Sequence, residues 1–363
     1  MIAQHVAIDW ETTGTRTSLE NAQLRTVEQM MALRIPGTSF EFGSRTPVVA
    51  LAVVLAMVSS LIVGPTPTAT ADPVTPVAKP VSATNTTISV YSQAMHRWVR
   101  SDVLHPVGRP AGLPTFYMLP GAGGAEDGIS WFNNTRVRQF FAGKRVNVVL
   151  PIGGRFSMMT DWRSNDPALG RNKWQTFITK ELPAAVNRQF RTNGINALSG
   201  VSMSAGPALD LATQVPGLYR AVAAYSGCPG TTDPLGQLAT MAVVARGGGN
   251  VANMWGAPGS ATWRQHDPVI NAGKLRGKAI YLSAGSGIAG PVDGSLLQNG
   301  SGLVGGNIIE AIALQCTTNM SNRLNGLGIG HRFVRRPDGV HTWGLFYADL
   351  RNSWPMIARA IGA

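Results

Sequence analysis

A serine between small residues is the first feature of this sequence that could do chemistry. Ser202 lies in the stretch Gly200-Val201-Ser202-Met203-Ser204, which follows an apolar run and precedes the apolar segment 208–215. A serine nucleophile on a sharp strand-to-helix turn needs small residues two positions before and after it, because the backbone there is strained and closely packed. Gly200 and Ser204 meet this need, although Ser204 departs from the last Gly of the G-x-S-x-G pattern. We predict a nucleophile at Ser202, with an ordinary Gly/Ser turn as the alternative.

A serine nucleophile needs a base, and the sequence holds six histidines. His341 lies in a late loop, after the last predicted strand, where the chain order of nucleophile, acid and base places it. His266 stands in a polar stretch, where we expect it to be solvated or to cap the N-terminus of a helix. The other four lie in the leader, before Ser202, or at the start of a strand: His5, His96, His105 and His331.

The orienting acid and the oxyanion hole are less determined by the residues alone. Asp293 lies in a Gly-rich loop after a predicted strand, and Glu310 lies on the next predicted helix, so spacing leaves both open as the acid. An oxyanion hole needs two backbone N–H groups aimed at the developing charge. We expect one from Met203 and the other from the Gly-rich loop 119–124. That loop has no following Lys-Ser/Thr, which excludes a phosphate-binding loop.

Short apolar runs alternate with helical patterns from about residue 86 onward. Strands are predicted at 87–92, 98–104, 115–119, 146–150, 195–199, 221–225, 279–283 and 331–335, the first two as an antiparallel pair. Helices are predicted at 174–190 and 306–327. This alternation predicts an α/β fold with a mostly parallel central sheet flanked by helices, and with functional residues at the carboxyl ends of the strands.

The N-terminal part has the composition of an export signal. Residues 47–63 are apolar but short for a membrane-spanning helix, and small residues at 69–71 predict cleavage after Ala71, with an uncleaved anchor as the alternative. Residues 1–46 form a leader of uncertain status, because translation could start at Met30 or Met31. Residues 72–85 are predicted to be a Pro/Thr-rich linker, and 86–363 one catalytic domain of a secreted or cell-envelope protein.

Charge excludes one class of function. The net charge is +12, and residues 1–71 sum to −1, which leaves +13 on residues 72–363. The arginines are scattered singly, and no zinc finger, Walker A loop or heptad repeat occurs. We therefore expect no nucleic-acid partner, and interpret the charge as suited to an anionic envelope surface. The sequence contains no metal-ligand cluster and no cofactor motif.

Taken together, these residues resemble the mycolyltransferases of mycolic-acid-bearing bacteria, the antigen 85 type of α/β-hydrolase. The resemblance extends over about residues 86–355. It rests on six segments in order: YMLPGAGGAEDGISW (117–131), NVVLPIGGRFSMMTDW (147–162), KWQTFITKELP (173–183), GVSMSAGPAL (200–209), NMWGAPGSATWRQHDP (253–268) and GVHTW (339–343).

The resemblance implies a role for individual residues. The family's catalytic Ser and His fall on Ser202 and His341, and its acid falls on Glu310, which decides against Asp293. The implied oxyanion amides are those of Ala122 and Met203. Substrate contacts are expected at Gly121, Gly123, Asp161, Trp162 and Trp343. The implied reaction is a ping-pong transfer of a mycolyl chain from trehalose monomycolate to a second such molecule or to wall arabinogalactan, without a cofactor, by a monomeric enzyme.

The sequence also departs from the better-known members of the family. Pro120 and Gly123 stand where those members have an Asp and an Arg that touch trehalose, so the sugar site must differ. Ala205 stands where Gly is common, which adds one methyl group at the start of a helix. The loop 121–127 looks more like the corynebacterial type of relative.

The resemblance gives the two cysteines a place. A Cys228–Cys316 disulfide would tie the predicted Glu310 helix to the sheet beside the active site. Segment 230–270 could form the wall of an acyl channel, with ordinary core packing as the alternative; its apolar members are Leu235, Leu238, Met241, Val243, Val244, Met254 and Trp255.

Two competing functions remain at this stage. A secreted carboxylesterase would use the same residues with water as the acceptor. A carbohydrate- or matrix-binding relative without activity is the second alternative, and the presence of Ser202, His341 and Glu310 argues against it.

Overall fold

The computed structural model describes residues 75–294 and 305–363 of the 363-residue chain. The described residues belong to one compact unit, Ala71–Ala363. The expected leader, the apolar run 47–63 and the expected cleavage site after Ala71 lie outside the described residues. Among the described residues, no helix is long and apolar enough to cross a membrane.

Within the described residues, nine strands form one sheet in the order β1-β2-β3-β5-β4-β6-β7-β8-β9. Neighbours from β5 to β9 pair in parallel, and the pairs β1–β2, β2–β3 and β3–β5 are antiparallel. The strands are β1 Val77–Ser82, β2 Asn85–Ser92, β3 Arg97–Leu104, β4 Thr115–Leu119, β5 Asn147–Pro151, β6 Asn196–Val201, β7 Tyr219–Tyr225, β8 Ala279–Ala284 and β9 Arg332–Arg335.

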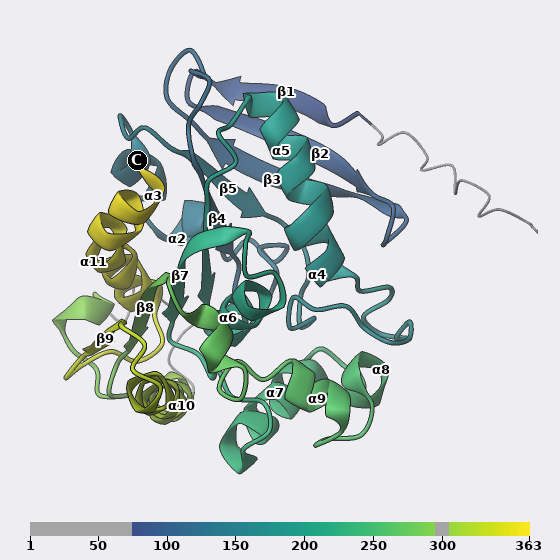
Figure 1. Ribbon diagram of the computed structural model, residues 1–363, viewed down its shortest axis with the longest axis vertical. Coiled ribbons are helices and arrows are strands. Elements are labelled where there is room, and N and C mark those ends of the chain that lie inside the picture. Colours follow the sequence, from purple (N-terminus) through teal and green to yellow (C-terminus); the bar gives the residue numbers. More distant parts are fainter. Residues whose placement is uncertain (1–74, 295–304) are drawn as a thin grey trace, which may run out of the picture. The chain divides into compact units, whose positions relative to one another are not determined.

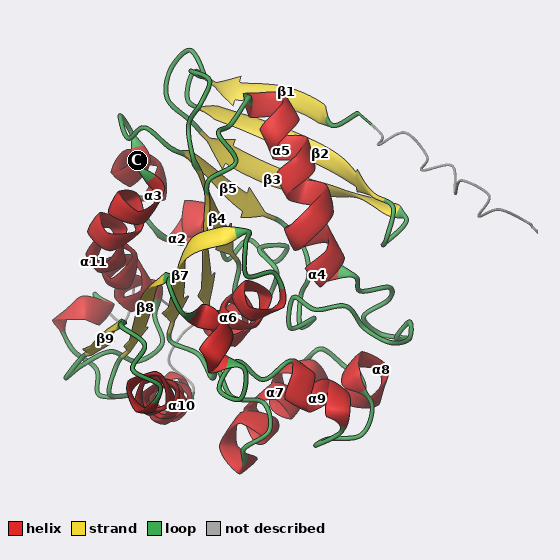
Figure 2. Cartoon of the chain, in the orientation of Figure 1, coloured by secondary structure: helices red, strands yellow, loops and turns green. Residues whose placement is uncertain are grey.

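Helices cover both faces of this sheet, as Figure 1 shows. The helices are α2 Trp131–Asn134, α3 Val137–Phe141, α4 Trp174–Thr176, α5 Leu182–Phe190, α6 Ala205–Gln214, α7 Pro234–Arg246, α8 Val251–Trp255, α9 Ala261–Gln265, α10 Gly306–Gly326 and α11 Trp343–Ile361. Short 3-10 turns lie at Ser202–Ser204, Ala272–Leu275 and Pro291–Asp293. A π-helical turn at Phe177–Glu181 joins α4 to α5, and the three are drawn as one helical stretch in Figure 2.

The core has two layers because side chains on a strand point alternately to opposite faces. In β4, Phe116 and Met118 pack against α3 and α11, whereas Tyr117 and Leu119 face the layer formed by α5, α6 and α10. All five residues of β4 are buried, as expected for a central parallel strand covered on both faces. The predicted α/β class with a mostly parallel sheet is confirmed.

Most predicted elements are present within a few residues of their expected bounds, and the main difference lies at the sheet edge. Val77–Ser82 forms β1 and pairs with β2, so the folded domain begins before residue 86 and half of the expected linker belongs to the sheet. Pro80 is tolerated there because β1 is an edge strand with an unpaired side. The Pro- and Thr-rich composition of residues 72–85 led the sequence analysis to predict a linker in place of this strand.

Candidate active site

Ser202 lies on a turn that only small neighbours allow. It follows β6 directly, opens the turn into α6, and has a left-handed backbone angle φ of +56°. A Cβ atom on Gly200 would overlap the carbonyl group of Ser204. The predicted requirement for a small residue two positions before the serine therefore has a direct steric cause. The turn stores strain and lifts the hydroxyl clear of the sheet.

A second glycine beside the serine was missed by the sequence analysis. Gly227 follows β7, the strand next to β6, and a Cβ atom on it would overlap the carbonyl oxygen of Ser202 and the Cβ of Ala205. The two strand ends therefore meet backbone against backbone. Gly227 carries no local motif that would reveal this contact, because the contact depends on the pairing of β6 with β7.

Three side chains from distant parts of the chain meet at this turn. Ser202 Oγ lies 2.8 Å from His341 Nε2, and His341 Nδ1 lies 2.7 Å from Glu310 Oε2. Glu310 is fully buried on α10, and its other oxygen, Oε1, accepts a hydrogen bond of 2.6 Å from the N–H of Gly285. With Nδ1 protonated toward Glu310, Nε2 is the free base that faces the serine hydroxyl.

Asp293, the other candidate acid, has a different place. Its Oδ1 accepts hydrogen bonds from the N–H of Val340 at 3.0 Å and from the hydroxyl of Thr342 at 2.7 Å. These residues stand on either side of His341, whose φ is +64°. Asp293 thus fastens the strained loop that carries the histidine, while the carboxylate of Glu310 contacts the ring.

The Gly-rich loop after β4 lies against the serine turn. The hydroxyl of Ser204 donates a hydrogen bond of 2.5 Å to the carbonyl of Pro120, and Gly121 stands close enough that a Cβ on it would lie 3.9 Å from Cβ of Ser202. The loop is also braced from behind, because the N–H of Phe156 donates to the carbonyl of Ala122 at 2.8 Å. Ala122 and Met203 therefore come from two segments that meet at Ser202.

Gly123 stands where the resemblance leads one to expect an Arg, and the side chain of Asp127 lies beside it. A Cβ on Gly123 would overlap the carboxylate of Asp127, which itself accepts a hydrogen bond of 3.0 Å from the N–H of Ile129. The absence of a side chain at 123 thus makes room for an acidic one that folds back over the loop. Gly121 and Gly123 remain partly exposed.

The other three expected substrate residues differ in how far they are buried and in what they contact. Trp162 is 1% exposed, lies in the core and donates its indole N–H to the carbonyl of Ser157, so its side chain presents no surface to a substrate. Asp161 accepts hydrogen bonds from the N–H and the hydroxyl of Thr176 and fixes the start of the α4 region. Trp343 is half-buried, packs edge-on against Trp131 and follows His341 by two residues.

A disulfide joins Cys228 to Cys316, as expected. Cys316 lies on α10 six residues after Glu310, and Cys228 follows Gly227 in the loop after β7. The hydroxyl of Thr317 adds a hydrogen bond of 3.1 Å to the carbonyl of Gly227. The acid-bearing helix is therefore attached covalently and by a hydrogen bond to the loop that supports Ser202.

An apolar cavity of about 90 Å³ opens beside the serine and the histidine. Besides Ser202, Met203 and His341, its walls come from Met158, from the disulfide loop, from α7 and from α10: Ser226, Gly227, Cys228, Ala239, Thr240, Val243, Ile309, Ile312 and Ala313. Of the apolar residues expected to wall an acyl channel, Val243 lines this cavity. Val244, Met254 and Trp255 are core residues, and Leu238 and Met241 are exposed.

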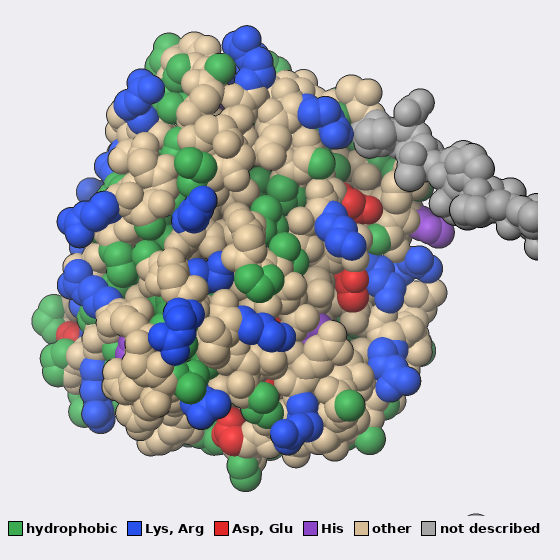
Figure 3. Space-filling model, in the orientation of Figure 1, with side chains coloured by type: hydrophobic (Ala, Val, Ile, Leu, Met, Phe, Trp, Pro, Cys, Tyr) green, Lys and Arg blue, Asp and Glu red, His purple; other side chains and the backbone are tan. Residues whose placement is uncertain are grey.

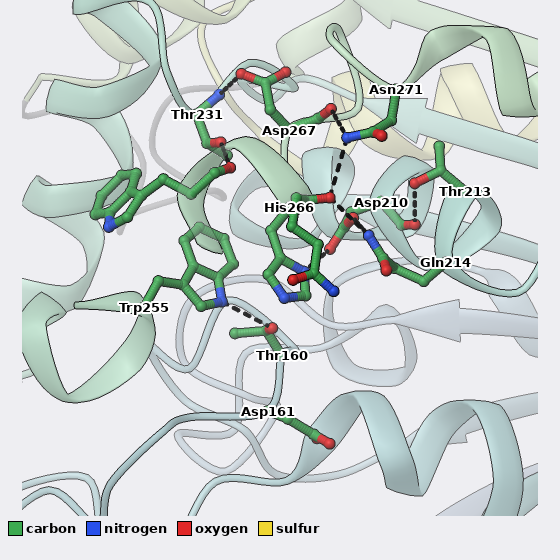
Figure 4. Close-up of polar contacts among 12 residues, drawn as sticks. Thr160, Asp161, Asp210, Thr213, Gln214, Thr231, Trp255, His266, Asp267 and Asn271 are labelled. Carbon is green, nitrogen blue, oxygen red and sulfur yellow. Dashed lines mark hydrogen bonds and ion pairs between the residues drawn. The ribbon is translucent and has the colours of Figure 1, made fainter. Parts of the chain in front are cut away.

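His266 is buried and stands at the C-terminal end of α9, not at a helix N-terminus, which corrects the expectation from its polar neighbours. It is 6% exposed, and its Nδ1 lies 2.8 Å from Oδ2 of Asp210 on α6 (Figure 4). Its ring stacks on Trp255 with centroids 4.9 Å apart. Asp267 beside it accepts hydrogen bonds from Thr231 and Thr232. This network attaches segment 230–270 to the helix that follows Ser202.

The cations are spread over the surface. Figure 3 shows Lys and Arg side chains scattered across one face with few acidic ones among them. In the part of the chain that the structure describes, no group of three or more His, Cys, Asp or Glu side chains could hold a metal ion.

Residues 92–356 match the family described as "Putative esterase". Diacylglycerol acyltransferase/mycolyltransferase Ag85B of Mycobacterium leprae is 30% identical over 262 residues, which cover 69% of this chain and 77% of that protein. Diacylglycerol acyltransferase/mycolyltransferase Ag85A of Mycobacterium tuberculosis is 32% identical over 269 residues, which cover 70% and 75% of the two chains.

Solved structures share the fold. MPT51 (FbpC1) of Mycobacterium tuberculosis superposes with a TM-score of 0.64 at 24% identity and covers 74% of this chain and 96% of its own. An S-formylglutathione hydrolase from Agrobacterium tumefaciens superposes with a TM-score of 0.56 at 15% identity, covering 79% and 100%.

Proposed function

Because the chain belongs to the esterase family as an acyltransferase of the antigen 85 type, we propose that Ser202 takes a long acyl chain from an acyl-sugar ester and passes it to a sugar hydroxyl. The observation that carries this proposal is the continuous path of hydrogen bonds from Ser202 through His341 to Glu310. Trehalose monomycolate is the proposed donor, because the curated relatives are named mycolyltransferases.

The reaction proceeds in two steps on the serine. His341 Nε2 accepts the hydroxyl proton as Ser202 Oγ attacks the ester carbonyl carbon, and the donor sugar leaves with that proton. The acceptor hydroxyl then gives its proton to His341 and attacks the acyl carbon. The bond between this carbon and Ser202 Oγ breaks, and Oγ takes the proton from His341, which restores the free serine. Glu310 stabilises the imidazolium in both steps, and the N–H groups of Ala122 and Met203 bind the oxyanion.

The apolar cavity is the proposed place for the start of the acyl chain. Its walls from α7 and α10 are mostly aliphatic, and both Ser202 and His341 border it. Its volume of about 90 Å³ is well below that of pockets enclosing a whole small ligand, which run to roughly 300–1,000 Å³. A long chain therefore has most of its length outside the cavity. Segment 230–270 contributes to this wall through α7.

The sugar side of the site lies along the loop after β4 and the start of α11. We assign it to Gly121, Gly123 and Trp343, because these residues flank the serine and the histidine and are partly exposed. Asp161 and Trp162 are left out of the substrate site because their polar groups are engaged within the protein. Asp127 lies over Gly123 and is the acidic group nearest to the loop at that point.

The proposed setting is the cell envelope. A disulfide persists in oxidising compartments, and the apolar run 47–63 followed by small residues at 69–71 favours export with cleavage after Ala71. The net charge of +13 on residues 72–363 suits an anionic surface, with wall arabinogalactan as a further acceptor. One chain supplies all three proposed catalytic residues, so the proposed site needs no second copy of the chain, and the proposed enzyme is a monomer.

Product analysis tests this function. The purified protein is incubated with trehalose monomycolate, and the products are separated by chromatography and identified by mass spectrometry. We expect a sugar carrying a second acyl chain, formed by the native protein and absent with Ser202→Ala. Free fatty acid alone, without transacylated sugar, would contradict the transferase proposal and favour a carboxylesterase.

A further inference from the structure

Two charged residues on either side of His341 pair with each other. Arg336 follows β9, five residues before the histidine, and Asp349 lies on α11, eight residues after it. Arg336 Nε donates a hydrogen bond of 2.7 Å to Asp349 Oδ1, and a second guanidinium nitrogen lies 2.7 Å from the same oxygen. The Asp349 side chain is fully buried and that of Arg336 is 17% exposed. The ion pair thus joins the two ends of segment 336–349, which contains His341.

We propose that Arg336 and Asp349 are a positioning pair that holds His341 in line with Ser202 and Glu310. This inference rests on the proposed function, because it concerns the base of the same reaction. Among the described residues, neither residue is hydrogen-bonded to a catalytic side chain. We infer that the pair acts through the backbone of segment 336–349, with the charge interaction between Asp349 and Glu310 as a second route.

The segment needs contacts that hold its conformation, because its backbone is strained at His341. His341 has a φ of +64°, a conformation that costs about 1–3 kcal/mol and persists only where the surroundings impose it. Asp293 fastens its centre through Val340 and Thr342. The N–H of Arg336 donates to the carbonyl of Ala284 at 3.0 Å, which fixes its start beside β8. The Arg336–Asp349 pair joins this start to the first turns of α11.

The surroundings of Asp349 make the pair sensitive to pH. Burial raises the pKa of Asp349 to about 6, the positive charge of Arg336 opposes this rise, and the carboxylate of Glu310 on α10 adds to it. Tyr281 on β8 and Tyr225 on β7 also face Asp349, and burial raises the pKa of both phenols well above their usual value, so they stay neutral. Asp349 therefore gains a proton just below neutral pH and the pair loses its ionic character.

This arrangement predicts a particular dependence of turnover on pH. As pH falls through about 6, Asp349 takes up a proton and the ion pair loses its charge, so the native enzyme loses part of its kcat in this range. A variant without the Asp349 carboxylate has no such group to protonate, so the ratio of native to variant kcat falls as pH falls through about 6. A residue that acted on stability alone would leave this ratio unchanged.

The test compares Asp349→Asn, Arg336→Lys and the native protein in hydrolysis of p-nitrophenyl butyrate, with kcat and KM measured across the acid limb. Asn keeps the shape and removes the charge, and Lys keeps the charge and loses the guanidinium fork. Above about pH 6, we expect kcat of Asp349→Asn to fall about tenfold to a hundredfold, as for a small misplacement of a reacting group, with KM unchanged. Below that pH, the difference in kcat between the native protein and this variant should shrink. Arg336→Lys lowers kcat less and keeps the native pH dependence.

Controls separate this inference from the function it rests on. Arg351→Gln removes an exposed cation of α11 that lies over Tyr347, and it should leave kcat and its pH dependence unchanged. Hydrolysis that is lost in Ser202→Ala shows that Ser202 is the nucleophile in this assay, and no hydrolysis by the native protein would contradict both proposals. Transfer to a sugar is measured separately with trehalose monomycolate, and its absence would contradict the proposed function alone. A folded Asp349→Asn protein with native kcat and native pH dependence would overturn the positioning role alone. If that variant does not fold, native kcat in Arg336→Lys would overturn it.

Discussion

The hydroxyl of Ser204 donates a hydrogen bond of 2.5 Å to the carbonyl of Pro120. This contact ties the serine turn to the Gly-rich loop that carries the expected oxyanion amide of Ala122. Ser204 is the residue that departs from the G-x-S-x-G pattern, and it is fully buried. Its side chain therefore adds a link between the nucleophile and the oxyanion loop that glycine at this position could not make.

Replacement of Ser204 by Ala tests this link. The buried carbonyl of Pro120 loses its donor, which costs about 1–3 kcal/mol of unfolding free energy. We expect kcat to fall about tenfold while KM changes little, because the oxyanion amides act mainly in the transition state. Urea unfolding and steady-state kinetics measure the two effects. Ser321→Ala removes another buried hydroxyl, hydrogen-bonded to His331, and serves as the control that loses stability without losing kcat.

Gly227→Ala is expected to abolish activity in a protein that still folds. The new Cβ overlaps the carbonyl oxygen of Ser202, so the serine turn must shift, at a cost of about 1–3 kcal/mol for an overpacked site. Labelling of the serine by a fluorophosphonate measures the loss, and thermal unfolding checks the fold. Gly217→Ala places its methyl group in open space and is the matched control. Equal labelling rates in the two variants would show that Gly227 does not support the turn.

Loss of the disulfide should lower stability and activity together. The Cys228–Cys316 bridge spans 88 residues, and a loop of that size contributes about 4.6 kcal/mol in the chain-entropy model. In the double variant with serine at both positions, α10 is freed from the loop after β7, so Glu310 is held less firmly. We expect a lower unfolding midpoint and a lower kcat at temperatures where the protein is folded. An unchanged kcat would mean that packing alone holds α10.

Asp349 predicts how stability changes with pH. Its pKa is raised to about 6 in the folded protein, against about 3.9 in an unfolded chain. Between these values the folded state binds more protons, so the contribution of Asp349 to the unfolding free energy falls as pH rises. Asp349→Asn removes this contribution. The unfolding free energy of the variant, relative to the native protein, should rise by up to about 3 kcal/mol from about pH 4 to about pH 6.

Urea unfolding at a series of pH values measures this difference. A difference that stays constant over the range would contradict the raised pKa. The direction of the change with pH also differs between stability and function at Asp349: the carboxylate lowers the unfolding free energy as it becomes charged, whereas the proposed positioning of His341 requires that charge. The charged carboxylate is costly to bury, and the proposed positioning of His341 depends on that same charge.

The sequence reaches the fold and the three proposed catalytic residues for identifiable reasons. Alternating apolar runs reveal β4 to β8, and the small residues around Ser202 mark the strand-to-helix turn. Spacing alone left Asp293 and Glu310 open, because both follow β8 and precede His341. They differ only in which one contacts the ring, and that depends on the packing of α10 against the sheet.

What sequence reasoning missed depends on contacts between distant segments. Gly227 meets Ser202 because β6 and β7 are neighbours, and no local pattern marks it. His266 has polar neighbours in the sequence, yet Asp210 and Trp255 enclose it. Trp162 belongs to a segment that resembles a substrate site, and its ring is buried in the core. Each case requires the tertiary arrangement.

The central claim is that Ser202 is the nucleophile, and a covalent label tests it most directly. The protein is reacted with a fluorophosphonate, digested, and the modified peptide is identified by mass spectrometry. We predict a single adduct on Ser202, formed at a much lower rate in His341→Ala and absent in Ser202→Ala. An adduct on a different residue, or full transacylation activity in Ser202→Ala, would contradict the account.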